Sequence, residues 1–237
     1  SIVVGKYVGD NALAAVGSSA PVYNLLLVLF IGVSTGSSIM VSQYFGAKDK
    51  ESLAKSIGNS LSLTAVVSLV IMALSLVVVD PMLHMLGTPD SIFDWCHDYL
   101  FILLIGVAGM SYYNILSGVL RGLGDSVSAL VYLLIACAIN IVLDLYFVAR
   151  LNMGVAGVAL ATVIAQAISA LCCLVKILRM TDVFHLKASS LKMEKKYSMD
   201  IVRLGLPSGL TQAIFSMAMV MVQSLTNSFG EMVIAAN

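Results

Sequence analysis

Two consecutive apolar runs in this sequence, residues 126–149 and 155–175, are each long enough to cross a lipid bilayer. A transmembrane helix needs roughly 20 predominantly apolar residues to span a hydrocarbon core about 30 Å thick. The five residues between the two runs, 150–154, have the composition of a turn. The sequence therefore predicts a transmembrane helical hairpin, and this hairpin constrains the fold more than any other feature.

The composition of the whole chain agrees with a membrane location. Of its 237 residues, 59% are hydrophobic and only 11% are charged, whereas about a quarter of the residues in a soluble domain are charged. We therefore expect a multi-pass protein of the cell membrane with membrane lipid as a partner. The formal net charge of zero argues against nucleic acid as a partner.

Other apolar runs extend this pattern along the chain. Together with the hairpin they give six full spans, and residues 1–4 resemble the end of one more helix. The expected fold class is all-α, a polytopic transmembrane helix bundle. Residues 80–98 contain prolines and histidines and are predicted to hold a short interfacial helix. The remaining spans are expected at about residues 11–42, 56–79, 99–120 and 204–228.

Basic residues in the loops indicate the orientation of the bundle. Eleven of the 13 Lys and Arg residues fall on one set of alternate loops, and only Lys6 and Arg150 fall on the other. Cytoplasmic loops of membrane proteins carry an excess of Lys and Arg, so the first set is predicted to be cytoplasmic. Its members are Lys48, Lys50, Lys55, Arg121, Lys176, Arg179, Lys187, Lys192, Lys195, Lys196 and Arg203.

Asp144 is the only ionisable Asp, Glu, Lys, Arg or His residue in the interior of any predicted span. A charged residue near the centre of such a helix costs roughly 2.5–3.5 kcal/mol on insertion scales, so these residues usually line a cavity or an ion path. Asn140 precedes Asp144 by four residues, which places both side chains on one face of a helix. Thr162 and Gln166 have the same spacing on the second arm of the hairpin.

If the two arms pack together, these four oxygen-bearing side chains face one another. Counting from the turn predicts Asp144 at the depth of Thr162, with Asn140 and Gln166 about one helical turn deeper. Such a cluster suits a proton or a small hard cation, and no other metal is expected beyond a coupling sodium ion at Asp144. The alternative is purely structural, because Asn, Thr and Gln often hydrogen-bond between membrane helices.

A short internal repeat suggests a second half. The sequence GDNALAA at residues 9–15 is similar to GEMVIAA at residues 230–236, after six predicted helices. Two parallel halves are a recurring transporter architecture, although a match this short can also arise by chance. We expect an amino-terminal six-helix lobe over residues 1–179, a cytoplasmic linker over residues 180–200, and the first helix of a truncated second lobe over residues 201–237.

Several motifs together resemble the multidrug and toxin extrusion (MATE) family in order and spacing. They are VGKYVGDNALAAVG, GVSTGSSIMVSQYFGAKD, NILSGVLRGLGDS, NIVLDLYFV, GVAGVALATVIAQ and GLPSGL. The resemblance implies a transporter and not an enzyme, which exports organic, often cationic or amphiphilic, drug-like compounds in exchange for protons or sodium ions. It implies no cofactor, and a partner in the missing second lobe of the same protein.

The resemblance also implies roles for individual residues. Asn140, Asp144 and Thr162 match the polar cluster proposed to bind the coupling ion in such proteins. An acidic residue of the family's first helix would fall immediately before Ser1, outside this chain. Tyr113 and Asn114 are weak candidates for substrate contact, with ordinary packing as the alternative.

Two other functions are alternatives to the transport of organic compounds by cation exchange. A lipid-linked oligosaccharide flippase has a related architecture, but it tends to line its cavity with Arg and Lys residues, which no predicted span contains in its interior. A membrane-embedded metalloenzyme would need a ligand cluster. The nearest candidates lie at a predicted external interface, where a solvated cap is the simpler interpretation: His84, Asp94, His97 and Asp98.

Overall fold

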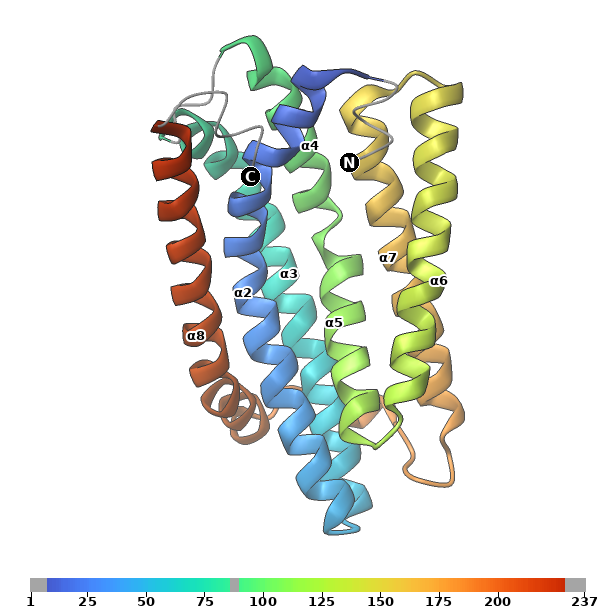
Figure 1. The fold of residues 1–237 in the computed structure, drawn as a ribbon. Helices are drawn as coiled ribbons and strands as arrows, with labels where there is room; N and C mark the ends of the chain where they lie inside the picture. The colour runs from blue at the N-terminus through green and yellow to red at the C-terminus, as the bar shows by residue number, and fades with distance from the viewer. Residues whose placement is uncertain (1–7, 86–89, 229–237) are drawn as a thin grey trace.

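The computed structural model describes residues 8–85 and 90–228, and within them the chain is almost entirely helical. The helices stand side by side in an upright bundle whose connections alternate between two ends (Figure 1). In chain order they are α2 (Asp10–Gly46), α3 (Lys50–Met85), α4 (Asp90–Ile105), α5 (Val107–Gly122), α6 (Ser126–Asp144), the π-helix η1 (Leu145–Arg150), α7 (Gly154–Arg179), the 3₁₀ helix η2 (Ala188–Leu191) and α8 (Lys195–Ser228).

The predicted polytopic helical bundle is confirmed. By length and composition, three described segments can cross a membrane, namely Lys50–Val77, Ser126–Arg150 and Gly154–Arg179, and the bent pair α4–α5 can provide a fourth. Helices α2 and α8, with 37 and 34 residues, are also longer than a bilayer requires. The six predicted spans thus correspond in order to α2, α3, α4–α5, α6–η1, α7 and α8. The helix end predicted at residues 1–4 lies outside the described residues.

The region after the second span differs from the sequence prediction. No separate interfacial helix fills residues 80–98 in the described part of the chain, because α3 continues to Met85 and α4 begins at Asp90. The third span is instead broken at Gly106, where α4 and α5 meet at 50°. A side chain at Gly106 would clash with Val163 of α7. The glycine therefore permits both the bend and the close approach of α7.

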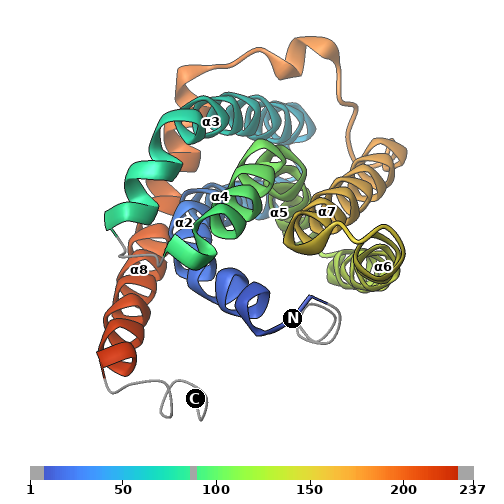
Figure 2. The same ribbon diagram turned by 90° about the horizontal axis from the view of Figure 1, so that it is seen from above.

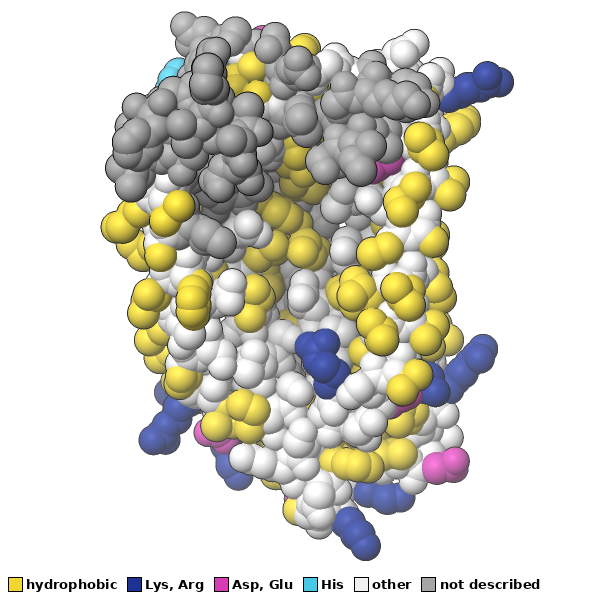
Figure 3. Space-filling model, in the orientation of Figure 1, with side chains coloured by type: hydrophobic (Ala, Val, Ile, Leu, Met, Phe, Trp, Pro, Cys, Tyr) yellow, Lys and Arg dark blue, Asp and Glu magenta, His cyan; other side chains and the backbone are white. Residues whose placement is uncertain are grey.

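The distribution of basic residues follows the predicted alternation of loops. In Figure 3 most Lys and Arg side chains lie in the lower half of the bundle, toward the end where α2 joins α3, α5 joins α6, and α7 joins α8 (Figure 1). Of the described Lys and Arg residues, Arg150 alone belongs to the opposite end, at the turn between η1 and α7. We therefore call the lower end the cytoplasmic end and the upper end the external end.

Helix α2 lies in the interior of the bundle and packs on α8, α5, α3 and α4. Seen from above, α6 lies at the periphery, beyond α7 (Figure 2). It packs mainly on α7, and many of its apolar side chains are exposed, including Val127, Leu130 and Val142. On a membrane protein such a surface faces lipid, so only one side of α6 is available to form an internal site.

The segment between α7 and α8 is attached to α3. Asn59 Oδ1 accepts hydrogen bonds from the backbone nitrogen of Glu194 at 2.7 Å and from Ser198 Oγ at 3.2 Å, and Ser62 Oγ donates to the Leu191 carbonyl at 2.6 Å. Helix α7 ends at Arg179, four residues beyond the predicted apolar run, and α8 begins at Lys195, inside the predicted linker. The division into two lobes stays a prediction, since the second copy of the repeat lies outside the described residues.

Candidate functional site in the α6–α7 hairpin

Asp144 is placed where the helical geometry of the first hairpin arm changes. Regular α-helix ends at Asp144, and the next six residues form the π-helix η1. There the Leu151 nitrogen donates to the Tyr146 carbonyl, five residues earlier, at 3.2 Å. Short π-helical turns are rare and occur frequently at functional sites. The sequence prediction of a continuous α-helix missed this feature, and composition alone offers no signal for it.

The carboxylate of Asp144 is withdrawn from the surface. Asp144 is 7% exposed. Among the residues whose burial the structure describes, it is the one charged residue that is buried. Its Oδ1 atom is buried and has no hydrogen-bond partner within the described residues. Buried polar atoms are normally satisfied, so this carboxylate is costly to the fold and available to a ligand.

Asn140 and Thr162 connect the two arms of the hairpin directly. Asn140 Nδ2 donates to Thr162 Oγ1 at 3.3 Å, and Thr162 Oγ1 donates in turn to the Val158 carbonyl at 2.9 Å. The prediction that the polar faces of α6 and α7 meet is therefore correct for this pair. The hydrogen bond also fixes the relative register of the two helices.

This register differs from the one expected from the sequence. Asn140, and not Asp144, is hydrogen-bonded to Thr162. Asp144 lies one helical turn closer to the external end, and Gln166 lies one turn closer to the cytoplasmic end. The π turn explains the shift, because its wider turn holds more residues than the regular α-helix assumed in the counting. The four side chains follow a line across about two turns instead of converging at one depth.

Gln166 resembles Asp144 in one respect. Its Oε1 atom is buried and lacks a hydrogen-bond partner within the described residues. It belongs to the segment of α7 that packs against the α4–α5 bend, where Gly109 approaches Ala167. The line of polar groups thus has an unsatisfied oxygen at each end and a hydrogen-bonded pair in the middle.

Tyr99 of α4 is a neighbour of Asp144 that the sequence analysis did not single out. Its phenol is close enough to the carboxylate for the two groups to interact electrostatically. Tyr99 also packs on an apolar cluster formed by Ala12, Val148, Val155 and Val158. Its position at the start of a predicted span, next to three acidic or basic residues, gave no reason to connect it with the hairpin.

The two weak substrate candidates occupy different environments. Tyr113 is 8% exposed within the apolar core between α5 and its neighbours, and its hydroxyl donates to the Ala129 carbonyl at 3.4 Å. Asn114 Nδ2 donates to the Met110 carbonyl at 2.8 Å, one turn earlier in its own helix. These contacts favour packing for Tyr113, and a role in substrate binding stays a prediction for both residues.

The histidines at the external end do not gather a metal-binding set. His97 lies between two carboxylates, with Nε2 at 3.5 Å from Asp80 Oδ1 and Nδ1 at 3.5 Å from Asp98 Oδ1. His84 packs on Phe93 instead. Within the part of the chain that the structure describes, no three His, Cys, Asp or Glu residues are arranged to hold a metal ion.

Ionisable residues within membrane-spanning segments often mark ion pathways and proton relays, so the helical bundle and Asp144 together point to a membrane transport protein. The family model MatE matches residues 1–146, so the chain belongs to the MatE family. Members of this family are transporters and not enzymes, and they are multi-pass proteins of the cell membrane.

Individual relatives agree with this assignment. The chain is 30% identical to the "Probable multidrug resistance protein YoeA" of Bacillus subtilis over 99% of its own length and 52% of that protein. It is also 30% identical to the "Probable multidrug resistance protein YpnP" of the same organism, again over 99% of the chain and 52% of the relative. The solved inward-facing structure of a multidrug resistance MATE family transporter shares the fold with a TM-score of 0.87 and 28% identity. That match covers 94% of this chain and 51% of the other.

The chain therefore spans about half the length of the relatives that it matches. Its fold and family are shown over that half.

Proposed function

We propose that this chain provides the cation-coupling half of an exporter of organic, drug-like compounds, driven by inward movement of protons or sodium ions. Asp144 carries the proposal, because it is a buried carboxylate with an unpartnered oxygen between α6 and α7. Among the described residues of these two helices, Gln166 Oε1 is the one other buried side-chain oxygen without a partner. Relatives described as multidrug resistance proteins support the export of small molecules. The second lobe of such a transporter would be the partner of this chain.

The line of polar groups suggests how the ion is held. Asp144 supplies the negative charge, and carbonyl and hydroxyl oxygens are the other ligands that a small hard cation prefers. Asn140 and Thr162 lie one turn away and already form a hydrogen bond, while Gln166 extends the line toward the cytoplasmic end. A carboxylate removed from water also binds a proton more readily than one in water, so either ion fits these residues.

Neutralisation of Asp144 is the proposed switch. The negative charge is costly in its apolar surroundings, and a bound proton or cation removes that cost. The π turn that follows Asp144 is a local departure from the α-helix, so its rearrangement would leave the rest of the arm intact. Ion binding would thereby favour one arrangement of the hairpin, and ion release the other, which is the requirement for alternating access.

The flippase alternative receives less support from the same observations. A site for a lipid-linked phosphate would need cationic side chains within the bundle. Among the residues whose burial the structure describes, no Lys or Arg is buried. Cation-coupled export of organic compounds is therefore the function that the geometry favours.

The decisive experiment replaces Asp144 with Asn, which keeps the size of the side chain and removes the charge and the exchangeable proton. Export of a fluorescent organic cation from membrane vesicles is measured with an imposed proton gradient, and separately with an imposed sodium gradient. We expect the gradient-dependent component to disappear while the amount of protein in the membrane is unchanged. Comparing the two gradients in the unaltered protein also identifies the coupling ion.

Asp94→Asn is the matched control. Asp94 is exposed on α4, so the same chemical change there should leave transport as it was. Gradient-driven export that persists in Asp144→Asn would refute the assignment of this carboxylate. Export that is lost equally in both variants would refute it as well.

A further inference from the structure

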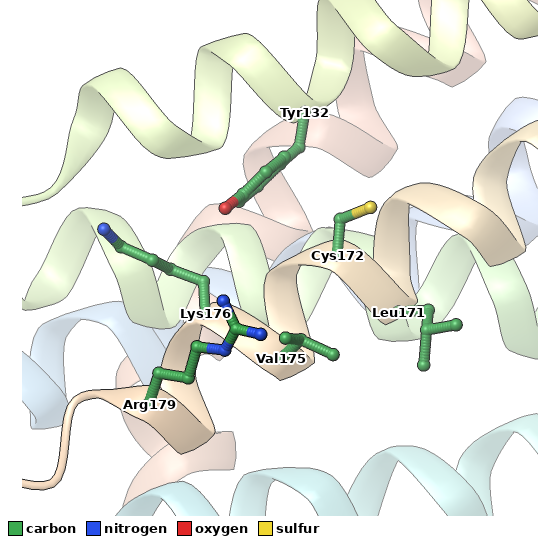
Figure 4. A pocket seen from close by; sticks show the side chains of 6 residues that line it. All are labelled: Tyr132, Leu171, Cys172, Val175, Lys176 and Arg179. Carbon is green, nitrogen blue, oxygen red and sulfur yellow. The ribbon is translucent and has the colours of Figure 1, made fainter.

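A pocket lies at the cytoplasmic end of the same hairpin, on its outer surface. It has a volume of about 300 Å³ and is lined by Tyr132 of α6 and by Leu171, Cys172, Val175, Lys176 and Arg179 of α7. Figure 4 shows that Lys176 and Arg179 lie together at one end of the pocket, whereas Leu171 lies at the other. Tyr132 extends from α6 with its hydroxyl directed toward the basic part of α7 (Figure 4).

The pocket is basic at the end nearer the cytoplasm. Arg179 is exposed, and no ion pair or hydrogen bond of its side chain is found within the described residues. Lys176 Nζ lies 3.4 Å from Asp125 Oδ2, which partly neutralises it. That carboxylate is itself engaged, because it accepts hydrogen bonds from the backbone nitrogen and the hydroxyl of Ser128. The positive charge of Arg179 therefore remains available for an anion.

The other end of the pocket is apolar and faces outward. Leu171 is 60% exposed and Val175 is 40% exposed. They belong to a helix that is apolar enough to cross the membrane, so these exposed side chains contact lipid. From Leu171 to Arg179 the helix rises about 12 Å, which carries the pocket from the acyl-chain region to the level of the headgroups.

We propose that this pocket binds an anionic phospholipid of the cytoplasmic leaflet. Arg179 and Lys176 contact the phosphate, and the Tyr132 hydroxyl is placed to hydrogen-bond the headgroup. One acyl chain lies along Leu171, Cys172 and Val175. Basic pockets between membrane helices on the cytoplasmic side are suited to lipid headgroups of this charge, and a guanidinium group is an effective partner for phosphate.

The apolar end of the pocket distinguishes a lipid from a free anion. A soluble phosphate would use Arg179 and Lys176 but would gain nothing from the apolar side chains one to two turns deeper. A neutral lipid would use the apolar side chains without the two cations. Both features together favour a lipid whose headgroup carries a net negative charge. The proposal rests on the orientation of the bundle and does not depend on the proposed transport function.

The test measures lipid binding by native mass spectrometry. The purified protein in detergent is mixed with phosphatidylglycerol and phosphatidylcholine in equal amounts, and we expect phosphatidylglycerol to be retained preferentially. Each basic residue near a membrane surface contributes roughly fivefold to such binding. The double variant Lys176→Gln, Arg179→Gln should lose about tenfold in phosphatidylglycerol retention, less than the full product because Asp125 already pairs with Lys176.

Two further variants make the result specific. Val175→Trp fills the apolar part of the pocket without changing any charge, and it should also reduce retention. Lys187→Gln, Lys192→Gln removes two exposed charges from the same end of the protein outside the pocket, and retention should stay within twofold of the unaltered protein. Thermal unfolding of each variant verifies that it is folded. If the double variant Lys176→Gln, Arg179→Gln is unstable, the two single variants Val175→Trp and Arg179→Gln decide the matter.

Three results would overturn the proposal. Unchanged phosphatidylglycerol retention in both pocket variants would show that the lipid binds elsewhere. An equal loss in the Lys187 and Lys192 control would show general attraction to a basic surface. Displacement of the lipid by millimolar inorganic phosphate would show a site for free phosphate, with no part played by the acyl chain.

Discussion

The pair of helices α2 and α8 and the pair α6 and α7 are held together by opposite means. Glycines bring the backbones of α2 and α8 into contact, and a side chain at Gly36 would overlap the carbonyl of Ile201 while one at Gly205 would overlap the carbonyl of Gly32. Small residues of this kind allow close packing between membrane helices. In the α6–α7 pair, the contact instead includes a side-chain hydrogen bond and two oxygens without partners.

This difference separates a closely packed contact from one that is open to rearrangement within one bundle. Close backbone packing has a single good arrangement, because any displacement loses many van der Waals contacts at once. The α6–α7 contact has polar groups that remain unsatisfied, so another arrangement or a bound ion can improve it. We infer that α2 and α8 move together as a unit and that the hairpin is the element that responds to ligands.

The largest effect on stability is expected from Gly36→Ala, at the contact between α2 and α8. Its new methyl group would meet backbone atoms of Ile201 and Gly205, and backbone cannot be moved aside cheaply. Overpacking typically costs about 1–3 kcal/mol, so the midpoint of thermal unfolding in detergent should fall by several degrees. Gly209→Ala is the control, because its added carbon would lie 3.6 Å from Gly32 Cα, at ordinary contact distance. Equal behaviour of the two variants would show that α8 is not tightly packed on α2.

A smaller effect on stability is expected at the cytoplasmic end of α6, opposite to Asp144, where both oxygens of the Asp125 carboxylate accept hydrogen bonds. Asp125 caps α6 by accepting hydrogen bonds from Ser128 N at 3.0 Å and Ser128 Oγ at 2.7 Å. Loss of such a cap costs about 1 kcal/mol, so Asp125→Ala should lower the stability of the protein by about that amount at neutral pH. Asp144→Asn, in contrast, should leave stability unchanged or raise it slightly, since it removes an unsatisfied charge.

The pH dependence of the stability lost in Asp125→Ala follows from the same contacts. The hydrogen bonds from Ser128, and to a lesser extent the charge of Lys176, hold the pKa of Asp125 below its ordinary value. A carboxylate whose pKa is lower in the folded state stabilises the fold above its unfolded pKa of about 4, and this contribution is lost as pH falls through the folded pKa. The stability difference between the unaltered protein and Asp125→Ala should be constant above about pH 5 and shrink on further acidification. A difference that grows toward acid would contradict the cap.

The sequence predicted the spans and the polar faces of the hairpin because both depend on local patterns. Runs of apolar residues mark helices, and the spacing of Asn140 and Asp144 places them on one helix face whatever the tertiary structure. The break at Gly106 was not predicted, because it depends on Val163, more than fifty residues later. The π turn after Asp144 was missed for a similar reason, and this error shifted the expected pairing with Thr162 by one turn.

The hydrogen bond between Asn140 and Thr162 should contribute the smallest measurable effect. Such bonds between membrane helices average about 0.6 kcal/mol in double-mutant cycles. We expect that value for the coupling between Asn140→Ala and Thr162→Val, measured from the unfolding of both single variants and the double variant. Thr162→Val keeps the shape of the side chain, so the cycle isolates the hydrogen bond.

Repeating this cycle in the Asp144→Asn background tests the functional side of the comparison. If the carboxylate and the hydrogen-bonded pair belong to one ion site, the coupling should change when Asp144 is neutralised, because residues in one polar network do not act additively. An identical coupling energy in both backgrounds would show that Asn140 and Thr162 only join the two helices. In that case Asp144 would act without them, and the hairpin contact would resemble the α2–α8 contact more closely than its unsatisfied oxygens suggest.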